Sequence, residues 1–206
     1  MVKNTSPEIA QIEIALAKSY RVAPFKLLLF IFWGLIVAKC CIVEWAILTY
    51  STPINGFLYV WIPSIVFGGV CSLVYARVSF EELRRAPIIS RLVRGVWGAC
   101  AISMIIFSVV SIGMRQYNPF ILPGIFAMLM AISYFIHSIL DSRKLFKISA
   151  AGWWIASIIL FYQLNIDSLA GLAVAILLFQ TTPTIVLYAQ ANKNYRTIAS
   201  QRGANI

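Results

Sequence analysis

Six long apolar segments, separated by short polar connections, account for most of the chain. They cover residues 24–50, 56–76, 95–114, 120–140, 148–164 and 168–189. A helix that crosses a bilayer needs about 20 mostly apolar residues, with roughly 17 to 25 tolerated. The first segment is the longest and the fifth is the shortest. The pattern predicts an all-α, polytopic membrane helix bundle with six transmembrane helices.

Residues 1–23 lack such a segment and instead carry the signature of a short amphipathic helix. Ser6 and Pro7 suit the cap and the first position of a helix. Ile9, Ile12 and Leu16 then recur at helical spacing, which favours a helix on the membrane surface over a polar tail. The predicted organisation is an amphipathic segment at 1–23, a transmembrane domain at 24–190 and a tail at 191–206.

The positive charges alternate between connections and give the chain a direction in the membrane. Of the 17 Lys and Arg residues, only Arg115 falls in a connection on the predicted outer side, and Lys39 falls inside the first span. All the others fall on the opposite side. Because Lys and Arg accumulate in cytoplasmic connections, both termini are predicted to be cytoplasmic. Five or seven spans would break this alternation.

Composition removes several classes of function. Apolar residues make up 61% of the 206 positions and charged residues 12%, so the net charge of +10 fits membrane topology better than nucleic-acid binding. The single histidine excludes bis-histidine haem ligation within one subunit and an HExxH zinc site. We therefore expect no enzyme activity, no metal and no cofactor. The four cysteines lie in apolar segments and suit small core positions.

Three prolines stand 60 residues apart, at Pro63, Pro123 and Pro183, each in a span predicted to run from outside to inside. Each begins a similar tetrad, which would suit three tandem hairpins. However, Pro183 falls late in its span and the other two fall early, whereas true repeats would share their depth. Kinks without repetition are therefore the preferred interpretation, because proline removes a backbone hydrogen bond from a helix.

Lys39 is the strongest candidate for a functional residue. It lies inside the first span, ~16 Å from the predicted outer boundary at ~1.5 Å per residue. An ionised lysine at that depth costs roughly 3 kcal/mol. Glu44, in the same span, is five residues away and about 140° around the helix. Pairing within one helix favours offsets of three or four, so each charge is expected to look to another helix or another subunit.

Depth along the spans suggests partners for the lysine. Ser103 in the third span, and Gln180 and Thr181 in the sixth, fall at similar distances from the outer boundary. We predict an intramembrane polar site made of Lys39, Glu44, Ser103, Gln180 and Thr181. It would either line a wet cavity or form a hydrogen-bonded clamp between helices. A cation that faces a pathway would favour anions.

Two other groups of polar residues are weaker candidates. His137 and Asp141 are four residues apart in the fourth span, and such a pair could move protons or sense pH, although helix-end polarity near the headgroups is the simpler explanation. The connection at 77–94 is rich in arginine and could contact lipid headgroups or a partner, with topology-setting as the simpler role. Its candidate contact residues are Arg84, Arg85, Arg91 and Arg94.

Two classes of function fit these features. The first is a small channel or transporter that uses the polar site of the first helix. The second is a non-catalytic accessory, scaffold or regulatory subunit of a larger membrane assembly, favoured by the scarcity of intramembrane polar groups. In either case the expected partners are the lipid bilayer and a second copy or another membrane protein. The expected location is the inner membrane of a bacterium.

Overall fold

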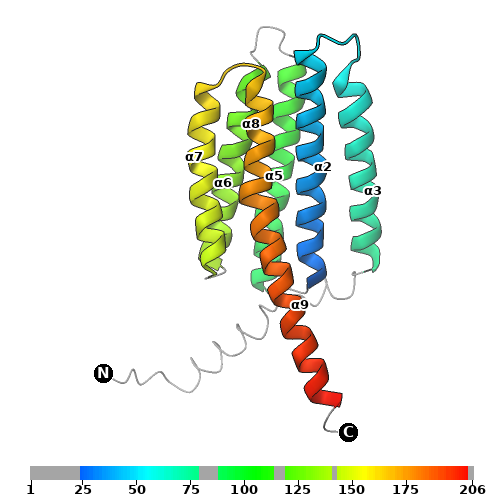
Figure 1. Cartoon of the computed structure of the whole chain (residues 1–206), viewed down its shortest axis with the longest axis vertical. Coiled ribbons are helices and arrows are strands. Elements are labelled where there is room, and N and C mark those ends of the chain that lie inside the picture. Colours follow the sequence, from blue (N-terminus) through cyan, green and yellow to red (C-terminus); the bar gives the residue numbers. More distant parts are fainter. Residues whose placement is uncertain (1–23, 79–87, 114–118, 141–142, 204–206) are drawn as a thin grey trace, which may run out of the picture.

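The computed structural model describes residues 24–78, 88–113, 119–140 and 143–203. Nearly all of these residues are helical, and the helices run alternately up and down in one bundle (Figure 1). The elements are α2 (Pro24–Thr49), η1 (Phe57–Trp61), α3 (Ile62–Val78), α5 (Ile88–Gly113), η2 (Pro119–Ile121), α6 (Leu122–Leu140), α7 (Lys144–Tyr162), α8 (Asp167–Ile176), η3 (Leu177–Thr181) and α9 (Thr182–Gly203).

Six of the described helical segments are long and apolar enough to cross a membrane, which confirms the predicted number of spans. Their limits differ clearly from the apolar pattern at three places, one of them the sixth span, whose last helix continues to Gly203 although the apolar segment ends at 189. The third helix begins at Ile88 and the fifth at Lys144, several residues before the apolar segments predicted at 95 and 148. Helical hydrogen bonding does not require apolar side chains, so a helix continues into polar sequence beyond the bilayer core.

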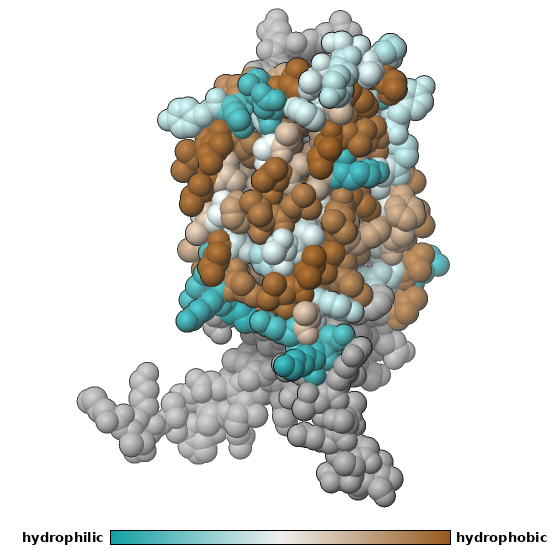
Figure 2. Space-filling model, in the orientation of Figure 1, coloured by the Kyte–Doolittle hydropathy of each residue, from teal (hydrophilic) through white to brown (hydrophobic). Residues whose placement is uncertain are grey.

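The bundle has two distinct ends. The C-terminus of α2 and the N-terminus of α8 lie at one end, called here the Thr49 end. The N-termini of α2 and α7 lie at the other, the Lys144 end, from which α9 projects (Figure 1). Figure 2 shows an apolar band between hydrophilic ends. The chain is therefore a multi-pass helical membrane protein.

Two of the three spaced prolines follow the same local distortion. The π-helical turns η1 and η3 end two residues before Pro63 and Pro183. In each, the backbone N–H one residue before the proline reaches the carbonyl five residues back, Phe57 in η1 and Leu177 in η3. Proline has no N–H, and its ring clashes with the carbonyl four residues earlier. The wider turn makes room for the proline ring. At these two sites the predicted distortion is therefore a π-helical turn just before the proline.

The described core is concentrated in α6, α7 and α8, and α2 packs along α8, η3 and α9. Small residues allow close approach there: a Cβ on Gly152 of α7 would overlap the Phe179 ring of η3. By contrast, only 11% of the span formed by η1 and α3 is buried, and only 6% of the α5 span, against 44% for α7. Thus α3 lies at the edge of the bundle, where α2 is its main support.

Candidate functional site

Lys39 lies on the outward face of α2. Between residues 27 and 47, the exposed residues of α2 are Leu28, Leu35, Lys39 and Ile42. At about 100° per residue these four positions cover an arc of roughly 60°, so they form one stripe along the helix, called here the Lys39 stripe. The lysine is the single charged member of this otherwise aliphatic stripe. Its side chain is therefore presented to the surroundings of the bundle.

Within the described bundle, the lysine donates one hydrogen bond, to α3. Lys39 Nζ donates to Ser64 Oγ at 2.9 Å, and Ser64 is only 8% exposed. A neutral hydroxyl satisfies one of the three N–H donors of an ammonium group and supplies no charge. The lysine stands near the middle of a 23-residue span, about 15 Å or more from either end at ~1.5 Å per residue. Among the described residues, a neutral hydroxyl and no acidic side chain therefore bonds to Nζ at this mid-membrane depth.

Glu44 is held at the Thr49 end of the same helix pair. Its carboxylate lies directly against the backbone of Gly56, at the position where a Cβ would be. The Oε2 atom of this carboxylate is buried without a hydrogen-bond partner among the described residues. Lys39 and Glu44 thus contact different parts of the η1–α3 segment, and no ion pair between them is recorded.

Gly56 is needed to accommodate this carboxylate. We expect Gly56→Ala to lower the free energy of unfolding by about 1–2 kcal/mol, because the new methyl group overlaps the Glu44 side chain. The measurement is an unfolding titration with sodium dodecyl sulfate in mixed micelles, followed by circular dichroism. In a Glu44→Ala background the same alanine should cost almost nothing. An equal cost in both backgrounds would assign the effect to the backbone.

The predicted polar site is divided between two faces of α2. Gln180 and Thr181 lie in η3 on the side of Gly34, where a Cβ would stand 2.6 Å from Thr181 Oγ1. Gln180 Nε2 donates to the Phe30 carbonyl oxygen of α2 at 3.2 Å. This arrangement has the form of a clamp between helices. Ser103 is half-buried on α5. The structure therefore brings Gln180 and Thr181 to α2, and gives Lys39 the partner Ser64 instead.

His137 belongs to an aromatic stack at the Lys144 end. Its Nδ1 accepts a hydrogen bond from Trp97 Nε1 at 3.3 Å, and its ring stacks on Phe146 at 4.1 Å between centroids. The Arg143 guanidinium lies over the Phe146 ring, 5.4 Å from its centroid.

Of the basic residues predicted to contact lipid or a partner, Arg91 and Arg94 are exposed near the start of α5. Asp141, Arg84 and Arg85 lie outside the described residues.

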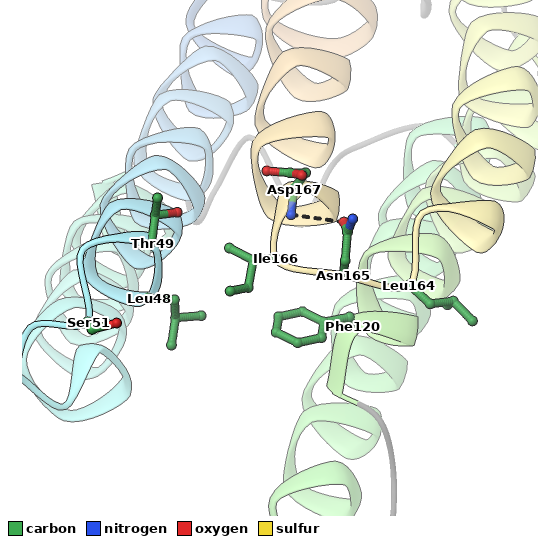
Figure 3. A pocket seen from close by; sticks show the side chains of 8 residues that line it. All are labelled: Leu48, Thr49, Ser51, Phe120, Leu164, Asn165, Ile166 and Asp167. Atoms are coloured by element: carbon green, nitrogen blue, oxygen red, sulfur yellow. Dashed lines mark hydrogen bonds between the residues drawn. The ribbon is translucent and has the colours of Figure 1, made fainter.

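An open pocket of about 780 Å³ lies at the Thr49 end (Figure 3). Its polar lining comes from the end of α2 and the start of α8, where Asn165 Oδ1 accepts a bond from the Asp167 N–H at 3.1 Å. Trp45 Nε1 donates to Asp167 Oδ1 at 3.1 Å and ties α2 to α8. Lys39 is not among the lining residues, so this pocket does not extend to the intramembrane charge.

Buried polar atoms inside the bundle include two, on Ser149 and Trp153, that the sequence analysis did not predict. Ser149 Oγ, Trp153 Nε1 and Thr181 Oγ1 are buried and have no hydrogen-bond partner among the described residues. Ser149 and Trp153 are four residues apart on α7 and therefore share a face. That spacing is visible in the sequence, but serine and tryptophan on a helix are so common that it carries little information by itself. Among the described residues, no group of three or more His, Cys, Asp or Glu side chains could hold a metal.

Comparison with known proteins adds no family to this geometry. No protein-family model matches the sequence, and no curated protein and no solved structure matches it. The function proposed below therefore rests on the geometry of the chain itself.

Proposed function

We propose that this protein is a non-catalytic subunit of a larger membrane assembly and that the Lys39 stripe is its contact with the rest of that assembly. The observation that carries the proposal is the position of Lys39 on the outward face of α2 at mid-membrane depth. Intramembrane lysines usually face a bundle interior or a watery cavity. An outward lysine is stabilised in the same way when another protein covers it.

The neighbourhood of the lysine supports a protein contact. Leu28, Leu35 and Ile42 are 37%, 50% and 47% exposed and follow each other at intervals of seven residues, the spacing of a helix–helix seam. A protein that covers the stripe would exclude lipid from the ammonium group. It would also supply hydrogen-bond acceptors for the N–H donors that Ser64 does not engage. An assembly subunit also needs no substrate pathway, and Lys39 is not among the residues that line the pocket at the Thr49 end.

The test compares the size of the assembly in the native membrane for two variants. The full chain, extracted in a mild detergent and run on a native gel, should migrate well above the monomer. We expect Lys39→Met to release the monomer, because the apolar side chain removes the charge that the partner recognises. Ile155→Met, at a 58% exposed position on α7, is the matched control and should leave the assembly intact. Assemblies of unchanged size in Lys39→Met would contradict the proposal.

A small channel or transporter is the second candidate, favoured by one observation. Ser149, Trp153 and Thr181 carry buried polar atoms that have no partner among the described residues, and Thr181 belongs to a π-helical turn, a distortion that is frequent at functional sites. Chloride and proton flux into vesicles that contain the purified chain tests this candidate. Transport predicts flux that Thr181→Val reduces, whereas flux equal to that of protein-free vesicles would remove it.

A further inference from the structure

We propose that the partner at the Lys39 stripe is a transmembrane helix of a different protein that carries a carboxylate at the depth of Lys39. This inference rests on the proposed function and names the chemistry of the partner. A carboxylate supplies both the opposite charge and two hydrogen-bond acceptors, so it satisfies the ammonium donors that Ser64 leaves free. In hydrocarbon, such pairing of intramembrane charges is the ordinary way to offset their cost.

The described spans of a second copy of this chain do not place a carboxylate at that depth. Two copies inserted in the same direction around a twofold axis would place Lys39 opposite Lys39, and like charges repel. The chain has seven Asp and Glu residues. Within the six described spans, Glu44 is the one acidic residue away from a span end. It stands ~7.5 Å nearer the Thr49 end, and its carboxylate rests on Gly56 of its own chain.

Lipid headgroups do not provide it either. Lys39 is ~15 Å or more from both ends of its span, and a lysine side chain extends only about 6 Å, even when it snorkels along the helix. Its Nζ is instead turned sideways to Ser64 on α3. An anionic headgroup would therefore have to enter the hydrocarbon core to reach it. A carboxylate fixed on a helix at the same depth needs no such displacement.

The surface beside the lysine suits a helix. The Lys39 stripe runs from Leu28 to Ile42, ~21 Å along the axis. On α3, Phe67 is 59% exposed, and its ring lies 5.9 Å from that of Phe32. The two rings stand about two turns from the lysine, toward the Lys144 end. They extend the apolar contact from α2 onto α3. The partner helix would thus meet a continuous aliphatic and aromatic surface with one cation in it.

The experiment uses the full chain in phosphatidylcholine vesicles with synthetic transmembrane peptides. The peptides are leucine–alanine helices of about 23 residues with Glu, Gln or Leu at the centre. Energy transfer between labelled peptide and labelled protein reports their association. We expect the Glu peptide to bind about tenfold more tightly than the Leu peptide. The difference should vanish in Lys39→Met and persist in Lys39→Arg. Ser64→Ala keeps the charge and removes its neighbour, so it should retain or increase the preference.

The other outcomes separate this inference from the proposed function. Equal binding of the three peptides to the wild-type chain would overturn the inference that the partner carries a carboxylate. The proposal that the protein is an assembly subunit would be unaffected. Energy transfer between two labelled populations of the protein, lost in Lys39→Met, would identify a second copy as the partner and overturn the inference alone. A preference that appears only when anionic lipid replaces phosphatidylcholine would assign the stripe to lipid. If neither peptides nor copies associate and the native assembly survives Lys39→Met, both proposals fail.

Discussion

Replacing Trp153 by alanine is expected to lower the free energy of unfolding by about 3 kcal/mol. Trp153 is fully buried, with a relative exposure of 0%, and its ring lies 6.4 Å from Phe179 of η3. Truncation of a buried tryptophan in a water-soluble core costs about 3–5 kcal/mol. Inside a bilayer the unfolded segments remain in an apolar medium, so the transfer contribution shrinks and the lost packing dominates. The lower end of that range is therefore expected.

The neighbouring residue supplies the control. Trp154 is 40% exposed, and lipid or detergent can fill the space that its truncation leaves. Trp154→Ala should therefore cost less than about 1 kcal/mol in the same dodecyl sulfate titration, in line with surface substitutions elsewhere. Similar losses for the two alanines would show that the interior of the bundle is no better packed than its surface.

A third substitution examines the unpaired indole N–H. Trp153 Nε1 is buried without a partner among the described residues, and such a donor carries a desolvation cost of about 1–3 kcal/mol. Trp153→Phe removes that donor and most of the ring's volume remains. We expect it to recover more than half of the loss seen in Trp153→Ala. Recovery by histidine but not by phenylalanine would instead indicate that the N–H has a partner.

The number of spans was readable from the sequence because two independent patterns carry it. Each apolar segment is long enough to cross a bilayer, and the connections rich in Lys and Arg alternate with connections that carry at most one such residue. Both patterns are local, so no knowledge of packing is needed. The helix limits at Ile88 and Lys144 were not readable, because continuation of a helix beyond the apolar segment depends on backbone hydrogen bonds.

Which residues contact Lys39 depends on how the helices pack. Matching depth along the spans was not enough to predict them. Matching depths along the spans selected Gln180, Thr181 and Ser103 for Lys39. Ser64 lies at a comparable depth and follows Pro63 directly, so the same criterion could have included it. What depth omits is rotation: Gly34 and Lys39 are five residues apart, about 140° around α2. The helix that contacts Gly34 therefore does not contact the lysine.

The close contact between α2 and η3 gives the second large effect. We expect Gly34→Ala to lower the free energy of unfolding by about 2 kcal/mol, within the range for overpacked positions. The added Cβ would stand 2.6 Å from Thr181 Oγ1 and 3.2 Å from Gln180 Nε2. Gly98→Ala on α5 is the matched control, because nothing lies within 4 Å of its Cβ. Alanine there should be neutral or stabilising by up to ~1 kcal/mol.

Thr181→Ala should rescue the Gly34→Ala chain if the hydroxyl is what obstructs the methyl group. Thr181 Oγ1 is buried without a partner among the described residues, so its removal alone should cost less than about 1 kcal/mol. The two substitutions should then be non-additive by about 1–2 kcal/mol. Additive losses would mean that α2 shifts away from η3 to relieve the overlap. Such a shift would also turn the Lys39 stripe, so Gly34→Ala alone would then weaken the preference for the Glu peptide. Rescue without that loss would show that the η3 contact fixes which face of α2 is presented outward.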